Sequence, residues 1–143
     1  MKSMKASMFL VTGAMAGLLS LAPVGAHHST AAFDNERVVK IEGTITQFRW
    51  INPHASIKID GIGEGDAPDG LWTVEMTAPN VLINQGWKRN SLVVGDRVTI
   101  YVNPLKNAVE LKDGSQGGLY VGVVTADGTK LGRTDGTGAG TDD

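Results

Sequence analysis

Hydrophobic and polar residues alternate with a period of two over much of the chain between residues 38 and 131. Such alternation is typical of half-buried β-strands, with one face toward a core and one toward water. Glycine-rich and Asn-Pro or Asp-Gly pairs separate the alternating stretches, as expected of turns. The pattern predicts five strands, centred on residues 39–50, 56–60, 72–76, 98–102 and 119–123.

The first of these strands changes phase near its end. Ile45 shares a face with the preceding apolar residues, whereas Phe48 and Trp50 fall on the opposite parity. If these aromatic side chains also point inward, the strand must contain a bulge or a strong bend near Gln47. The sequence therefore predicts an irregular first strand that ends at an Asn52-Pro53 turn.

A short helix is predicted between the third and fourth strands, within residues 78–87. Pro79 suits the first turn of a helix, and Gly86 is placed where a helix ends in a left-handed residue. Three strands, one helix and two strands is the order of an oligonucleotide/oligosaccharide-binding (OB) fold, a small five-stranded Greek-key barrel. We therefore predict an all-β domain with one short helix, and the alternative is an open β-sandwich with a helical connection.

The two ends of the chain lack this alternation. Residues 1–26 combine Lys2 and Lys5 with an apolar stretch and the small residues Val24-Gly25-Ala26, which is typical of a signal peptide cut after Ala26. The apolar stretch of residues 8–21 is shorter than the ~20 residues that cross a membrane. We expect a periplasmic or secreted protein with no membrane segment after cleavage, an N-terminal arm at 27–37, an OB-like domain at 38–131 and a disordered tail at 132–143.

Composition narrows the candidate chemistry. The chain has 13 Lys and Arg against 15 Asp and Glu, and cleavage would make the mature protein more acidic. A net negative charge argues against nucleic-acid binding. The chain has no cysteine, so its stability must come from a packed core and its metal ligands cannot include thiolates.

The three histidines, His27, His28 and His54, suggest a metal site. Cleavage after Ala26 would give His27 a free α-amine, which can bind one ion together with its own ring nitrogen. His54 is the natural third nitrogen ligand, and His28 is an alternative ligand. A planar set of nitrogens suits Cu(II), so we expect copper handling or delivery between envelope partners. Zinc is less favoured because its catalytic sites usually add a carboxylate base that the sequence does not place.

Other interpretations of these residues stay open. The two adjacent histidines are also compatible with a solvated chain end, and His54 with a turn residue that binds the backbone. A different class of function is a metal-independent module that binds an envelope glycan, peptide or protein through Trp50, Trp72 or Trp87, although a core role suits these tryptophans better. No catalytic residue is identified, and a copper-dependent oxidase would need a substrate surface that the sequence does not display.

Several short motifs resemble a family of short exported bacterial proteins of unknown function. The resemblance covers residues 26–131 and implies no activity, so it groups the motif residues without assigning them a role. The motifs are His27-His28-Ser29, Gly43-Thr44-Ile45, Trp50-Ile51-Asn52-Pro53-His54-Ala55, Gly86-Trp87 and Gly95-Asp96-Arg97-Val98.

Overall fold

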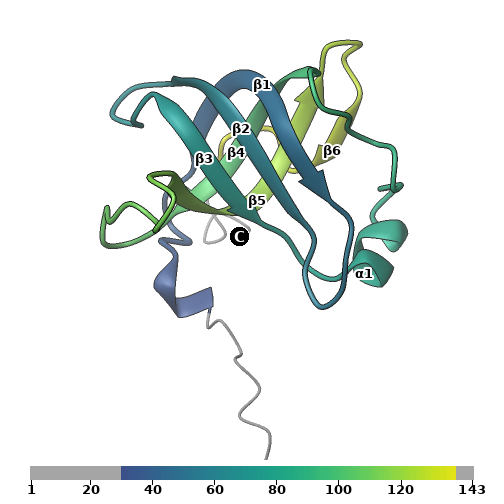
Figure 1. The fold of residues 1–143 in the computed structure, drawn as a ribbon, viewed down its shortest axis with the longest axis horizontal. Coiled ribbons are helices and arrows are strands. Elements are labelled where there is room, and N and C mark those ends of the chain that lie inside the picture. The colour runs from purple at the N-terminus through teal and green to yellow at the C-terminus, as the bar shows by residue number, and fades with distance from the viewer. Residues whose placement is uncertain (1–29, 138–143) are drawn as a thin grey trace, which may run out of the picture.

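The computed structural model describes residues 30–137, in which β-strands are the predominant regular secondary structure (Figure 1). One short α-helix lies between the third and fourth strands, as the sequence predicts. A sixth strand follows a turn at Asp127-Gly128. The elements are the 3-10 helix η1 (Thr30–Ala32), β1 (Val39–Arg49), β2 (Ser56–Gly63), β3 (Gly70–Glu75), α1 (Pro79–Asn84), β4 (Arg97–Pro104), β5 (Gln116–Thr125) and β6 (Lys130–Gly132).

The sheet closes on itself. Antiparallel pairing runs in the order β3-β2-β1-β4-β5-β6, and β3 also pairs in parallel with β5, from Trp72 opposite Gln116 to Glu75 opposite Leu119. This parallel contact joins the two sides of the sheet, so the first five strands form a mixed β-barrel. The prediction of a small all-β barrel with one short helix is confirmed, and the alternative of an open sandwich is excluded by the β3–β5 pairing.

The predicted irregularity in β1 is also present. Its register with β2 shifts between Ile45 and Gln47, as expected of a β-bulge. Beyond the shift, Phe48 and Trp50 are partly buried and pack against the core. The bulge therefore allows apolar residues of both parities in β1 to face the inside of the barrel.

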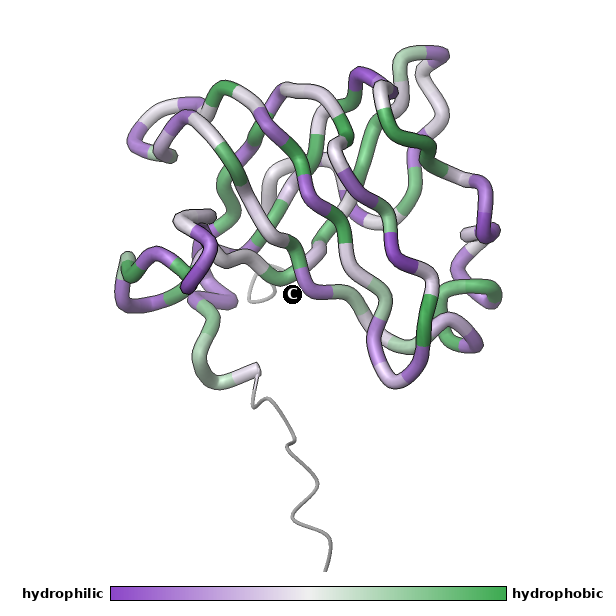
Figure 2. The backbone as a smooth tube through the Cα atoms, viewed as in Figure 1, coloured by the Kyte–Doolittle hydropathy of each residue, from purple (hydrophilic) through white to green (hydrophobic). Residues whose placement is uncertain are grey.

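The core lies inside the barrel and continues beneath α1. Green and purple segments alternate along the strands in Figure 2, in agreement with inward apolar and outward polar positions. Leu82 of α1 and Trp87, just after it, are at most 1% exposed and close one end of this core. The largest fully buried side chains are Trp72, Trp87, Ile41, Ile45, Ile57, Ile59, Met76, Leu82, Ile100, Val74, Val102 and Val123.

Pro79 and Gly86 occupy the predicted positions at the two ends of α1. Pro79 occupies the first turn of α1, and Gly86 adopts a φ of 88° just past its end. The Trp87 N–H donates to the Leu82 carbonyl at 3.0 Å, which turns the chain back beneath the helix. Trp87 is thereby directed into the core rather than toward solvent.

The described part of the N-terminal arm packs on the end of β4. Phe33 is buried and forms an isolated bridge with Leu105. The Asp34 N–H donates to the Pro104 carbonyl at 2.8 Å, and the Lys106 N–H donates to the Ala32 carbonyl at 3.0 Å. The predicted signal peptide, the start of the arm and residues 138–143 of the predicted tail lie outside the described residues, so these boundaries stay predictions.

Candidate functional site

His54 lies in the turn between β1 and β2 and contacts the end of β3. Its Nδ1 is 2.8 Å from Oε1 of Glu75, and the two side chains are 41% and 29% exposed. The neighbouring Ala55 is buried and fixed on both sides, because its N–H donates to the Thr77 carbonyl and its carbonyl accepts from the Met76 N–H. The turn therefore holds His54 beside Glu75 at the surface of the barrel.

The carboxylate of Glu75 sets the chemistry of the imidazole. A carboxylate accepts hydrogen bonds, so a neutral His54 ring carries its proton on Nδ1 and its lone pair on Nε2. Histidines that bind metals commonly have this arrangement, in which the second ring nitrogen is fixed by a carboxylate. The pair presents Nε2 as a ligand or proton acceptor.

The three sequence-predicted metal ligands are only partly placed. His27 and His28 lie outside the described residues, so their approach to His54 stays a prediction. Within residues 30–137, no group of three or more His, Cys, Asp or Glu side chains is arranged to hold a metal ion.

The sequence alone does not place Glu75 in the site. The alternation in β3 places Glu75 opposite in parity to the buried Val74, which indicates only that it faces outward. Its partner depends on the pairing of β2 with β3, where Ser56 lies opposite Glu75 and brings the preceding turn within reach. Predicting the His54–Glu75 contact requires this register, and the sequence alone does not give it.

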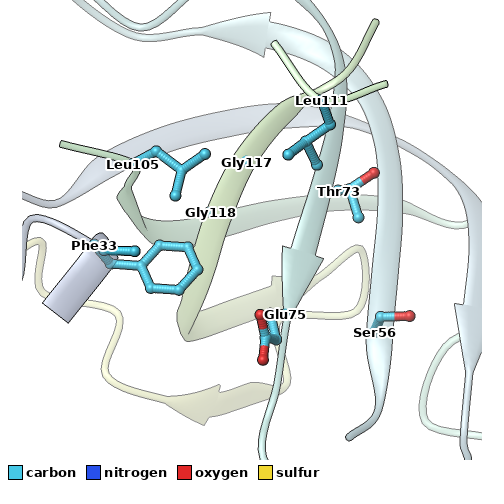
Figure 3. A pocket seen from close by; sticks show the side chains of 9 residues that line it. Phe33, Ser56, Thr73, Glu75, Leu105, Leu111, Gly117 and Gly118 are labelled. Carbon is cyan, nitrogen blue, oxygen red and sulfur yellow. The ribbon is translucent and has the colours of Figure 1, made fainter. Parts of the chain in front are cut away.

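A cavity of about 460 Å³ lies beside Glu75 on the outside of the barrel. Figure 3 shows Phe33, Leu105 and Leu111 grouped around the β5 backbone at Gly117 and Gly118, with Glu75 at one side. The cavity therefore joins the end of the N-terminal arm to the strand that carries Glu75. Its lining residues are Ala32, Phe33, Ser56, Thr73, Glu75, Leu105, Leu111, Gly117 and Gly118.

The loop between β4 and β5, which contributes Leu111 to the cavity, is fixed by polar contacts. Lys58 Nζ lies 2.6 Å from Oδ2 of Asp113, and the buried Ser115 hydroxyl donates to Oδ1 of the same carboxylate at 2.6 Å. These hydrogen bonds hold the pKa of Asp113 well below its usual value. Ser115 Oγ also lies 2.8 Å from Thr73 Oγ1, so the loop is tied to β3 as well as to β2.

The tryptophans occupy core positions. Trp72 is 2% exposed and Trp87 is 1% exposed, while the partly buried Trp50 packs edge-on against Phe48 with ring centroids 5.8 Å apart. The interpretation of Trp72 and Trp87 as core residues is confirmed. These two side chains do not form an exposed stacking surface.

Fold and site together define a small OB-like β-barrel with a surface histidine–carboxylate pair and an adjoining apolar cavity. No helix within residues 30–137 has the length and apolar character needed to span a membrane. The chain belongs to a family of unknown function (DUF6152), which matches residues 17–119 and so includes all three histidines. No curated protein and no solved structure matches the chain.

Proposed function

We propose that this protein binds a metal ion in the periplasm or outside the cell, and that it handles or delivers copper. The ligands are the α-amine and ring of His27 together with the ring of His54, and His28 is an alternative ligand. Three nitrogens in one plane suit Cu(II), which also leads the affinity order of the divalent first-row metals. Zinc is the less favoured ion for the same ligand set.

The observation that carries this proposal is the 2.8 Å contact between His54 Nδ1 and Glu75 Oε1. The carboxylate orients the ring through Nδ1 and leaves Nε2 to face a metal ion, as is usual for metal-binding histidines. The pairing thus favours His54 as a ligand through Nε2.

The start of the described chain also supports the proposal. Ala32 and Phe33 line the same cavity as Glu75. His27 precedes Thr30 by three residues, which span at most about 11 Å when extended. The described part of the arm therefore lies on the side of the barrel that carries the His54–Glu75 pair, and the chain that links His27 to it is short.

The exposure of the His54 side chain favours metal transfer over catalysis. The His54 side chain is 41% exposed, so a metal bound to it would be accessible to the ligands of a second protein. Partner exchange requires such access, since the receiving ligands must enter the coordination sphere before the donor ligands leave. We therefore propose a partner protein of the cell envelope as the donor or acceptor of the ion.

The test is a Cu(II) titration of protein that has been exported and processed, with mass spectrometry to establish the first residue. We expect one tightly bound Cu(II) per chain, with three nitrogen ligands in the electron paramagnetic resonance spectrum. Binding should be lost in the His27→Ala/His54→Ala double variant and when one extra residue precedes His27, while His28→Ala should retain it. Unchanged affinity in the double variant would refute the proposal.

A further inference from the structure

The cavity beside Glu75 has a specific chemical character. Three large apolar side chains, Phe33, Leu105 and Leu111, form its walls, and they come from the arm, the residue just after β4 and the β4–β5 loop. Its volume of about 460 Å³ lies within the range of small-molecule sites. The cavity therefore suits the carbon skeleton of a small ligand.

Glycine at position 117 keeps this space open. A Cβ at Gly117 would lie 2.5 Å from Cδ1 of Leu105 and 3.7 Å from Cδ2 of Leu111, so it would project between the two leucines that line the cavity. A larger residue on this strand would occupy the volume that a ligand needs. The backbone of β5 thus forms the floor of the cavity.

The charge of the cavity lining indicates which polar group a ligand would carry. Among the described residues that line the cavity, Glu75 is the only ionisable side chain, and Ser56 and Thr73 supply hydroxyl groups. A carboxylate offers two oxygens, and His54 contacts Oε1. An ammonium group is the natural partner of a carboxylate at the edge of an apolar site, whereas an anionic ligand would be repelled.

We propose that this cavity binds a small primary amine with an apolar body, with its ammonium group on Glu75 and its carbon chain against Phe33, Leu105 and Leu111. This binding needs no metal ion and no contribution from His27 or His28. It is therefore a second activity of the barrel that does not require copper, although both sites share Glu75.

Hexylamine, hexan-1-ol and hexanoate test the proposal, because they share a six-carbon chain and differ in charge. We titrate each into the full processed chain and follow the backbone amide signals of Gly117, Gly118 and Thr73 by nuclear magnetic resonance. Hexylamine should shift these signals in a saturable manner and bind about tenfold or more tightly than hexanoate. Equal affinity of the amine, alcohol and carboxylate, or the absence of saturable shifts with hexylamine, would overturn the proposal.

Variants distinguish the contribution of the Glu75 charge to ligand binding from that of the open cavity. Glu75→Gln should remove the preference for hexylamine and leave hexan-1-ol binding intact, whereas Glu42→Gln, on β1, serves as a matched control and should change neither. Gly117→Val should weaken hexylamine and hexan-1-ol alike. Leu111→Lys, in the partly exposed loop, provides a second test if Gly117→Val does not fold, and it should reject hexylamine by placing a cation at the cavity. Retention of amine selectivity in Glu75→Gln contradicts the assignment.

His54→Ala distinguishes the two sites. It should abolish tight Cu(II) binding under the proposed function and leave hexylamine bound, because Glu75 remains in place. Loss of copper binding with retained amine binding supports both assignments. Loss of hexylamine binding in a folded His54→Ala protein would contradict the independence of the amine site from the histidine.

Discussion

The indole of Trp87 donates a hydrogen bond to the hydroxyl oxygen of Tyr120, with Nε1 and Oη 3.1 Å apart. Their rings meet edge to face, with centroids 5.3 Å apart and an interplanar angle of 80°. This contact joins the segment after α1 to the middle of β5. It also places a phenol in largely buried surroundings, where burial raises the pKa of Tyr120 to about 12.

We expect Tyr120 to make folding stability fall at alkaline pH. Its pKa is about 12 in the folded protein and near 10.0 in the unfolded chain, so the folded state binds more protons between these values. The contribution of neutral Tyr120 to the free energy of unfolding is complete below pH 10. It falls by roughly 2–3 kcal/mol as the pH rises toward 12.

Urea unfolding of the wild type and Tyr120→Phe across pH 8 to 12 measures this effect. Tyr120→Phe should be less stable by roughly 1–3 kcal/mol at pH 8, since the buried Trp87 N–H loses its acceptor. The difference should shrink as the pH rises. Parallel stability curves for the two proteins would show that Tyr120 does not titrate with folding.

A second prediction concerns the close approach of β1 and β2. Gly43 lies opposite Gly61, and a Cβ at Gly43 would meet the Asp60 carbonyl oxygen at only 2.2 Å. Because that neighbour is backbone, Gly43→Ala should force the strands apart and destabilise the protein by about 1–3 kcal/mol or more. Thr44→Ala, at the next position of β1, is the control and should have the smaller effect in thermal or urea unfolding.

A third prediction concerns the β4–β5 loop. Asp113→Asn removes the charge that faces Lys58 and weakens the acceptor for the Ser115 N–H and hydroxyl. Hydrogen exchange should accelerate at residues 111–115, which include the Leu111 and Ser115 amides. Glu110→Gln, in the same loop, should leave this exchange unchanged. Equal exchange in wild type and Asp113→Asn would show that backbone contacts alone hold the loop.

A fourth prediction links Glu75 to copper. Glu75→Gln keeps the shape of the side chain but removes the carboxylate that orients His54. Under the proposed function, the affinity for Cu(II) should fall by about 10- to 100-fold, as is usual when such a supporting group is lost. Glu42→Gln is the control. A Cu(II) affinity that is the same in Glu75→Gln and wild type would exclude the carboxylate from the metal site.

The barrel was predictable because its evidence is repeated along the chain. Five alternating stretches each report the same period, and the helix is marked at both ends, by Pro79 and Gly86. The bulge was predictable because Phe48 and Trp50 could reach the core only if the strand changed phase. These features depend on neighbours in sequence, which the alternation records directly.

The His54–Glu75 pair and the cavity were not predictable in the same way. His54 and Glu75 meet through the register of β2 on β3, and the cavity forms where Phe33, Leu111 and Gly117 converge from three separate segments. Each residue has an ordinary local pattern, and only the tertiary arrangement gives it a chemical neighbour. His27 and His28 lie outside the described residues, so their role as ligands stays a prediction.

The division of β5 between two partners has a consequence for self-association. Along one edge β5 pairs with β4, while its other edge pairs first with β3, at residues 116–119, and then with β6, at residues 122–124. Open sheet edges are the places where strands of other chains add and fibrils begin. Because barrel closure pairs the strands on both sides and β6 is only three residues long, the described barrel offers little template for strand addition by a second molecule.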